Sequence, residues 1–433
     1  MKHTTRLFIL ISSMSFLFGA CKINPIQDPN NPSLDHLSSN PTLSEIQNLV
    51  TGIESGMRTD MAFYWDDCGV LGREYYHFST SDPRWTSDLV GKGNSVLDNN
   101  TFYTTRPYNS NYLTVKNANI LLSGLVNSTA QMTDAQRKVG MAYANTMKAY
   151  ELLLALNLQR DSIRVSVSDP DHLGPFVPAA VAMDTIDALM DNAYADLNAN
   201  ASATFPFNST VFGNNAGTFA QFNRALRARM AVYTGDWQGA LTALGNSFMT
   251  MGGDLNKGAY YLYSLAGGDM LNPEFRPLNS SGEVLAALDS IVTQADPGDL
   301  RLSKVSKRDQ PITLDGLTTH YDFYLYKTNV DPLPIIRNEE LILIYAEANI
   351  QLNNLTEGEN ALNIIRNAAG LADYGGPVTQ ADLINEMLKQ RRYSLFGEGH
   401  RWIDMRRYNR LAQLPNERPG DHVWARFPKP FGE

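Results

Sequence analysis

Apolar residues recur every three to four positions along most of this 433-residue chain. This spacing places apolar side chains along one face of an α-helix. It predicts helices over residues 133–158, 183–200, 218–234, 237–249, 338–352, 357–368, 379–396 and 400–411. The clearest is 338–352, where one face carries Leu341, Ile344, Tyr345, Ala348 and Leu352. The pattern therefore indicates a body built mainly of helices.

Local signals mark where some of these helices begin and end. Thr133 followed by Gln136 matches a capping box, in which both side chains satisfy backbone groups of the first turn. Thr379 followed by Asp382 is a looser version of the same signal. Gly370 stands where the helix that starts near residue 357 should end, because glycine readily adopts the left-handed conformation found after helices.

Two stretches, 227–244 and 344–365, have the pattern of a helix, a tight turn and a second helix. Both carry small residues that let paired helices approach closely: Ala228, Ala231, Ala240, Ala346, Ala348 and Ala361. Such hairpins resemble tetratricopeptide packing, with only a partial match to the ~34-residue repeat. We expect an all-α fold of tetratricopeptide-like helical hairpins, which usually present a docking surface.

Two segments between the helices are less regular. Residues 60–115 and 252–335 are rich in Gly, Pro, Asn and aromatic residues, and 321–326 alternates enough to predict a short strand. Long irregular insertions in a compact domain are often functional. We therefore look in these two segments for a binding site.

The N-terminus has the pattern of an export signal. Lys2 and Arg6 precede an apolar run over 7–18, which is followed by small residues and Cys21. This predicts a lipoprotein signal peptide over 1–20 and lipidation of Cys21; the alternative is ordinary cleavage, with an incidental thiol. Residues 21–41 are rich in Pro, Asn, Asp and Ser, which predicts a lipid-anchored flexible tether before a body spanning 42–433.

Composition and charge exclude several classes of protein. The formal net charge of −9 argues against a nucleic-acid binder, which needs clustered Lys and Arg. Two cysteines cannot form a disulfide framework or a four-ligand zinc site. His400 and Asp404 lie four residues apart, but no second His stands nearby, so we expect no metal and no cofactor.

The C-terminal third resembles the SusD/RagB family in three ordered blocks. They are the Arg-Asn-Glu-Glu-Leu run of 337–348, the Ala-Leu-Asn-Ile-Ile-Arg run of 361–371 and the Gln-Arg-Arg-Tyr run of 390–407, which includes Glu-Gly-His-Arg-Trp. The sequence departs from the family pattern at Ala368, Gln390 and Ser394. The resemblance is strong only over about 336–433, and weaker traces include the Gly-Asp-Trp of 235–237.

This resemblance implies a surface lipoprotein of the outer membrane. Such a protein captures a nutrient, most often an oligosaccharide or polysaccharide, and delivers it to a SusC-like TonB-dependent barrel. The family is not catalytic, so Glu398, Arg401 and Asp404 are implied to be structural residues only.

Aromatic residues are the main candidates for ligand binding. In 60–115, 11 of 56 residues are aromatic, about 20%, against 10% in the whole chain. Sugars can lay their C–H faces on such rings while their hydroxyls bond to polar side chains. Rings with polar neighbours are proposed as the platform, and polar residues beside them as hydrogen-bonding partners: Trp65, Tyr75, Tyr76 and Trp85, with Arg84 and Asn94.

A second aromatic group lies in 252–335 and predicts another wall of the site: Tyr260, Tyr261, Tyr263, His320, Tyr321 and Tyr324. The alternative for all these rings is packing of loops onto helices, which we expect for at least half of those in 60–115. Phe63, Phe78, Phe102 and Tyr112 are predicted to be packing residues, with Tyr112 at the start of an amphipathic helix.

Three other functions stay open at this point. The same fold could capture peptides or another solute. The chain could be a helical glycoside hydrolase, which needs two carboxyl groups ~5–9 Å apart in a cleft; abundant acids such as Asp66, Asp67, Asp82, Glu339 and Glu340 supply candidates. It could also be an assembly scaffold of the cell envelope.

Overall fold

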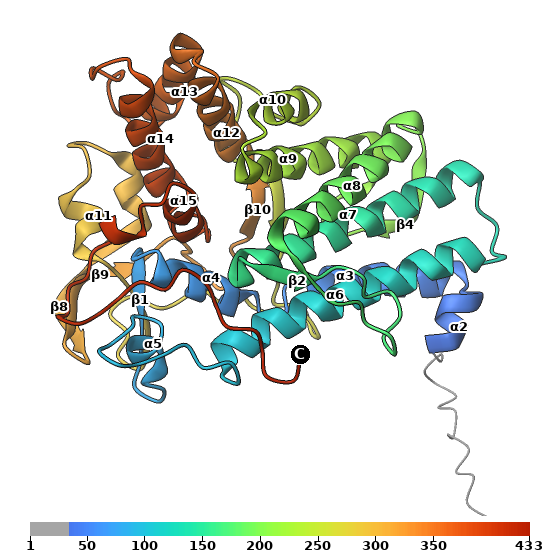
Figure 1. The fold of residues 1–433 in the computed structure, drawn as a ribbon, viewed down its shortest axis with the longest axis horizontal. Coiled ribbons are helices and arrows are strands. Elements are labelled where there is room, and N and C mark those ends of the chain that lie inside the picture. Colours follow the sequence, from blue (N-terminus) through green and yellow to red (C-terminus); the bar gives the residue numbers. More distant parts are fainter. Residues whose placement is uncertain (1–33) are drawn as a thin grey trace, which may run out of the picture.

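The computed structural model describes residues 34–433, and the predicted signal peptide and Cys21 lie outside this range. Long helices dominate it (Figure 1). The first group comprises α6 (Phe102–Asn127), α7 (Asp134–Gln159), α8 (Ala179–Ala199), α9 (Ala216–Thr234) and α10 (Trp237–Gly245). The second comprises α12 (Asn338–Gln351), α13 (Leu355–Ala368) and α14 (Gln380–Ser394), followed by the short α15 (Arg401–Arg407).

Successive long helices pack against each other as antiparallel neighbours. The pairs α9–α10 and α12–α13 are the two hairpins that the sequence predicts, and α10 packs on α12 to join the two groups. The predicted all-α, tetratricopeptide-like fold is confirmed, with small sheets added to it.

The predicted helix signals are present. The Thr133 side chain accepts from the Gln136 N–H, and Gln136 in turn accepts from the Thr133 N–H, so the capping box is complete. Thr379 caps α14 through the Asp382 N–H. Gly235 has φ +76° in the tight turn between α9 and α10, and Gly370 has φ +78° just after α13. Both conformations favour glycine.

The described residues begin with three helices: α2 (Leu34–Ser39), α3 (Leu43–Gly56) and α4 (Met61–Leu71). The prediction that 21–41 is a flexible tether is wrong for its last residues. Helix α2 packs on α6, where the Asn127 amide donates to the Ser38 carbonyl at 3.0 Å. The Asn40 side chain also accepts from the Thr129 N–H at 2.8 Å. These contacts fix the segment to the helical body.

The two segments predicted to be irregular meet in one antiparallel sheet of order β1-β7-β9-β8. Its strands are β1 (Tyr75–Ser79), β7 (Glu283–Ala287), β8 (Val305–Leu314) and β9 (Leu317–Phe323). Tyr75 pairs with Ala287, which pairs in turn with Tyr321. The predicted strand at 321–326 thus corresponds to β9, displaced toward the N-terminus. The short helices α5 (Arg84–Ser87) and α11 (Asp289–Thr293) flank the sheet.

Three two-stranded sheets complete the fold. They are β2 (Ser162–Arg164) with β3 (Phe176–Pro178), β4 (Thr204–Ser209) with β5 (Gly213–Asn215), and β6 (Gly258–Tyr261) with β10 (Leu333–Arg337). Segments η1 (Leu300–Lys304) and η2 (Leu411–Gln413) are 3₁₀ turns. The description of 60–115 as irregular is corrected, since it contains α4, β1, α5 and the first half of α6.

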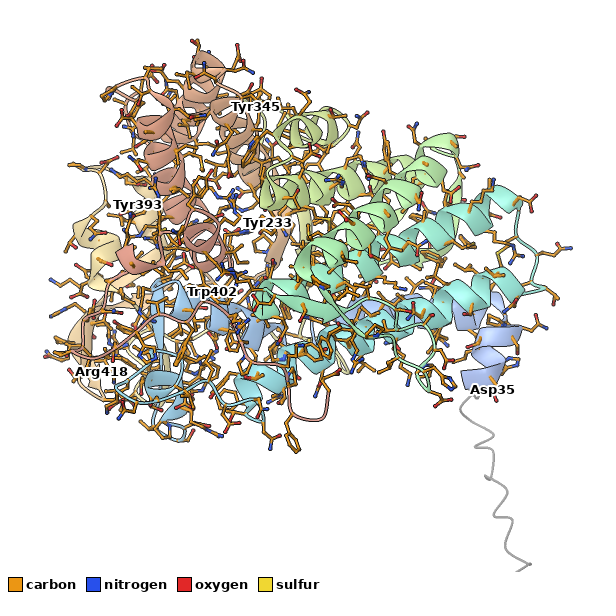
Figure 2. The ribbon with its side chains drawn as sticks, in the orientation of Figure 1. Asp35, Tyr233, Tyr345, Tyr393, Trp402 and Arg418 are labelled. Carbon is orange, nitrogen blue, oxygen red and sulfur yellow. The ribbon has the colours of Figure 1, made fainter. Side chains whose placement is uncertain are left out.

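The family-like C-terminal blocks form a buried framework. Trp402 is fully buried, and its indole N–H donates to the Trp424 carbonyl at 2.8 Å (Figure 2). Arg337 pairs with Glu398 at 2.7 Å, and Arg391 pairs with Asp404 at 2.7 Å. These charged side chains are almost fully buried, so the family-like blocks pack the interior of the protein. Among residues 34–433, no helix is long and apolar enough to cross a bilayer.

Candidate functional site

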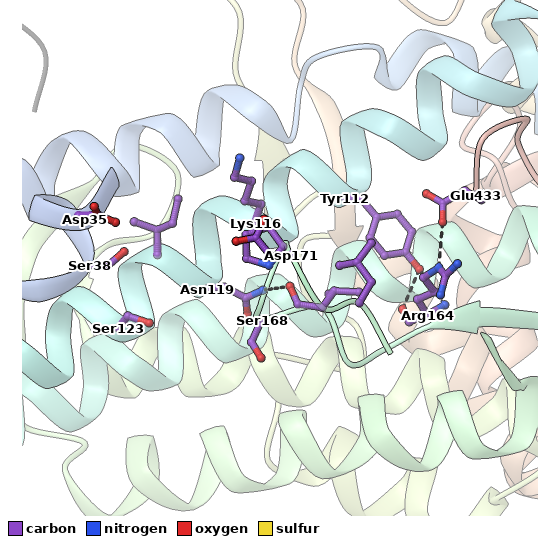
Figure 3. Close-up of a pocket in the computed structure, with 14 residues that line it drawn as sticks. Asp35, Ser38, Tyr112, Lys116, Asn119, Ser123, Arg164, Ser168, Asp171 and Glu433 are labelled. Carbon is purple, nitrogen blue, oxygen red and sulfur yellow. Dashed lines mark hydrogen bonds and ion pairs between the residues drawn. The ribbon is translucent and has the colours of Figure 1, made fainter. Parts of the chain in front are cut away.

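A cavity of about 620 Å³ lies beside α6 (Figure 3). Helices α2 and α6, the loop between β2 and β3, and the last residue of the chain form its walls. The lining residues are Asp35, Ser38, Tyr112, Lys116, Asn119, Ile120, Ser123, Arg164, Val167, Ser168, Pro170, Asp171, Leu173 and Glu433. Its volume is within the usual range for small-molecule sites.

One face of α6 supplies the floor of this cavity. Tyr112, Lys116, Asn119, Ile120 and Ser123 follow one another at helical spacing, so their side chains share a face. Figure 3 shows Ser123 toward the end of the cavity near Asp35 and Tyr112 toward the end near Glu433. Along the helix, the floor therefore offers an aromatic ring, an amine, an amide, an apolar side chain and a hydroxyl.

The loop between β2 and β3 is fixed to α6 by hydrogen bonds. The Tyr112 hydroxyl donates to the Arg164 carbonyl at 2.7 Å and accepts from the Arg164 N–H at 3.1 Å. The Asn119 amide donates to the Val167 carbonyl at 2.9 Å. These bonds hold the loop, which forms one wall of the cavity, in a defined position. A wall that is already ordered reduces the entropic cost of binding a ligand.

The charged residues at the cavity differ in how far they are already paired. Arg164 forms an ion pair with Glu433 at 3.0 Å, and half-buried Lys148 donates to the Asn119 side-chain oxygen at 2.8 Å. Burial lowers the pKa of Lys148. The Lys116 amine and the Asp171 carboxylate are exposed and have no partner within residues 34–433. Free groups of both signs thus face the cavity.

The structure contradicts the predicted aromatic platform. Trp65, Tyr75, Tyr76 and Trp85 are each at most 5% exposed. The Trp85 ring stacks on His77 with centroids 4.0 Å apart, and the Tyr75 ring packs on Phe323 at 4.8 Å. Their polar sequence neighbours do not prevent burial, because the sheet and its flanking helices close over them. In this conformation, these rings pack the core and offer no face to a ligand.

Hydroxyl groups of the buried tyrosines also find partners inside the protein. Tyr75 donates to the Trp65 carbonyl at 3.0 Å, and Tyr76 donates to Glu417 at 3.0 Å. The rings therefore satisfy their polar atoms without solvent or ligand.

The remaining predicted residues are more accessible but lie outside the cavity. Arg84 is half-exposed and pairs with Asp82 at 2.6 Å, and Asn94 is exposed. Tyr321 and Tyr324 are half-buried on or next to β9, and the Lys327 amine lies 3.3 Å from the centre of the Tyr324 ring. None of these residues lines the cavity beside α6.

The residues of the second predicted wall are likewise partly buried and partly accessible. Tyr261 and Tyr263 are buried, whereas Tyr260 is half-buried and His320 is exposed. The Tyr260 ring lines a different depression of about 220 Å³, with Arg301, Lys304 and Glu398.

Several cavity residues were missed by the sequence analysis. The sequence predicts that Tyr112 is a packing residue, and its ring does pack on Tyr108 with centroids 4.6 Å apart. Lys116, Asn119 and Ser123 follow Tyr112 at helical spacing, and this pattern could have indicated a polar helix face. No sequence pattern connects α6 with Arg164 or with Glu433, because only the tertiary fold brings them together.

All but one of the carboxylates considered for hydrolysis are buried in the core, and the exception, Asp82, is paired with Arg84. Glu340 pairs with Arg229 at 2.6 Å, and Glu339 pairs with Arg337. Asp66 and Asp67 are buried, and burial raises the pKa of Asp67 well above its usual value. His400 is buried beside Glu340, and burial lowers its pKa to about 4. Within residues 34–433, no group of three or more His, Cys, Asp or Glu is arranged to hold a metal ion.

Comparisons with known proteins relate this chain to one family. Residues 318–423 match the model described as the SusD family. The fold is similar to that of surface glycan-binding protein A from Bacteroides thetaiotaomicron, with a TM-score of 0.69, 14% identity and coverage of 90% of this chain and 96% of that chain. No curated protein matches the chain at a significant level.

Two further solved structures share the fold. A SusD superfamily protein from Parabacteroides distasonis has a TM-score of 0.68, 16% identity and coverage of 90% of this chain and 96% of that chain. Surface glycan-binding protein A from Bacteroides uniformis has a TM-score of 0.66, 16% identity and coverage of 89% and 96%. At such identities the likeness concerns the fold.

Proposed function

The chain belongs to the SusD/RagB family, and from this membership we propose that it is a glycan-binding protein for nutrient uptake. The observation that supports this most is the family match of residues 318–423 within a fold shared with two proteins named surface glycan-binding proteins. The chain would act by equilibrium binding, without catalysis.

The cavity beside α6 is our candidate for the glycan site. The loop that forms one of its walls is already held in place. The Tyr112 ring and the apolar side chains of Ile120 and Leu173 suit the C–H faces of a sugar. The free groups of Lys116 and Asp171 suit sugar hydroxyls, because an amine donates hydrogen bonds and a carboxylate accepts them. A volume of about 620 Å³ suits more than one sugar unit.

The setting follows from the family and the export signal. A lipid on Cys21 would hold the protein at the outer membrane, facing outward, and a SusC-like TonB-dependent barrel would receive the glycan. Copurification of a large barrel from detergent-solubilised membranes tests this partnership.

The glycan site is tested by calorimetry on the mature protein with a panel of oligosaccharides and, alongside it, a peptide mixture. Ser123→Trp should block the cavity from an exposed position and weaken glycan binding at least tenfold, or ~1.4 kcal/mol. Val126→Trp is the matched control, since Val126 is 56% exposed on the same helix and lies outside the cavity lining.

Unchanged glycan affinity in Ser123→Trp would place the site elsewhere on the protein. A response to peptides with none to glycans would overturn the ligand class, while leaving the cavity as the candidate site if Ser123→Trp abolished that response.

A further inference from the structure

A second cavity, of about 270 Å³, lies where the end of α7 meets α8, α9 and α15. It shares no lining residue with the cavity beside α6. Tyr233, near the centre of the molecule in Figure 2, forms part of its wall, with Leu156 and Met183. Three arginines, Arg160, Arg406 and Arg407, also line it, and no lining side chain is acidic.

Two of these guanidinium groups have no carboxylate partner among the described residues. Arg407 is neutralised by Glu347 at 2.7 Å and by Asp404 at 2.8 Å. Arg406, in contrast, donates only to two backbone carbonyls, those of Ala425 at 3.2 Å and Asn157 at 2.7 Å.

Arg160 is exposed, and its side chain forms no ion pair or hydrogen bond with any other residue of 34–433. The nearest acid in sequence, Asp161, is itself paired with Arg426. Burial lowers the pKa of Arg406 to about 10, and the like charge of Arg160 adds to this effect. The Arg406 guanidinium also lies over the Trp402 ring, 4.4 Å from its centre. The cavity therefore holds two guanidinium groups that no carboxylate of residues 34–433 neutralises.

The backbone at Arg160 supports a role for its side chain. Arg160 follows the last residue of α7 with φ +64° and ψ −48°, outside the regions that side-chain-bearing residues prefer. Glycine would adopt this conformation without strain. An arginine at such a position lowers the stability of the fold relative to a glycine, and strained residues of this kind cluster at functional sites.

We propose that this second cavity binds the carboxylate of an acidic monosaccharide, with Arg160 and Arg406 as its partners; the choice of a sugar rests on the proposed function. Guanidinium groups bind carboxylates strongly, often through two parallel hydrogen bonds. The walls formed by Leu156, Met183 and Tyr233 provide apolar surface for the sugar ring. The volume lies just below the usual range for small-molecule sites, which suits a single sugar unit.

The test is calorimetry of the mature protein with D-glucuronate, with D-glucose as the neutral control and sulfate as the plain anion. We expect saturable binding of glucuronate that weakens with added salt, and at least tenfold weaker binding of glucose and sulfate. Arg160→Gly should abolish glucuronate binding while leaving the melting temperature unchanged or higher, because it removes backbone strain and no side-chain hydrogen bond or ion pair within residues 34–433.

The matched control is Lys138→Gln, which removes one positive charge from an exposed position on the same helix. It should leave glucuronate binding unchanged. Equal binding of glucose and glucuronate, or unchanged binding in Arg160→Gly, would overturn the proposal. Sulfate binding as tight as glucuronate binding would overturn the assignment of a sugar. Ser123→Trp in the cavity beside α6 should leave the binding of glucuronate unchanged. The experiment can therefore contradict this proposal without contradicting the proposed function, and the reverse.

Discussion

Arg229 on α9 and Glu340 on α12 form a two-point ion pair across 111 residues of sequence. The Arg229 Nε and Nη2 atoms each donate to one Glu340 carboxylate oxygen at 2.6 Å, and both side chains are buried. Burial opposes ionisation of Glu340, but the Arg229 guanidinium outweighs it and lowers the pKa to about 2. The pair links the first group of helices to the second, which carries the family-like blocks.

Replacing one member of this pair should be far more costly than replacing both. Arg229→Met leaves the Glu340 carboxylate buried and unpaired, so we expect a loss of ~3–5 kcal/mol in the free energy of unfolding. The double variant Arg229→Met with Glu340→Leu removes both charges and should recover much of that loss. Denaturant unfolding followed by circular dichroism measures each value. A double variant less stable than the single one would contradict this account.

Glu74 should make the protein less stable as pH rises. Burial raises the pKa of its carboxyl to about 8, although nearby Arg401 partly opposes the shift. Below the unfolded pKa of about 4.5, both states are protonated and the group contributes nothing. Between about 4.5 and 8, the unfolded chain ionises while the folded protein does not, so stability falls by roughly 4 kcal/mol.

Glu74→Gln should remove this loss of stability. We expect the variant to match the native protein near pH 4.5 and to need more denaturant for unfolding at pH 8. The control is Asp184→Asn, an exposed carboxylate on α8, which should leave the pH profile of stability unchanged. If Glu74→Gln and the native protein keep the same difference in stability at both pH values, the carboxyl does not titrate as described.

Much of the helical fold could be predicted because apolar residues recur at a helical period in most of the long helices, as Ala361, Leu362 and Ile365 do in α13. Helix α4 was missed because residues on nearly every face of it are buried, among them Trp65, Asp66 and Asp67, so its sequence shows no single apolar face. Helix α6 was recognised only in part, since Pro107 and several buried polar residues obscure its period.

The candidate site was harder to predict than the fold. Trp85 has polar neighbours in sequence, yet the folded chain stacks it on His77 in the core. Arg164 and Glu433 meet across 269 residues, and neither belongs to a local motif. Composition identified an aromatic-rich segment, but whether a ring faces solvent depends on strands that pair far apart in sequence, such as β1 with β7.

Cys21→Ser tests the predicted lipid anchor, which lies outside the described residues. If Cys21 carries the lipid, the native protein should fractionate with membranes and be released only by detergent. The serine variant should lose the acyl chains and their contribution of about 0.8 kcal/mol per buried CH₂, and should appear in the soluble fraction. Cys68→Ser is the matched control, because Cys68 is buried in α4 and should leave fractionation unchanged. A Cys21→Ser protein that still sediments with membranes would argue against the anchor.

Trp85→Ala separates a packing role from a binding role. The ring is 5% exposed and contacts His77, Phe63 and Phe102, so its removal should cost ~3–5 kcal/mol in the free energy of unfolding. Glycan affinity measured by calorimetry on the folded fraction should stay within twofold of the native value, because Trp85 does not line the cavity beside α6. A tenfold loss of affinity with little loss of stability would restore the aromatic platform predicted from the sequence, and would require the sheet region to open when the ligand binds.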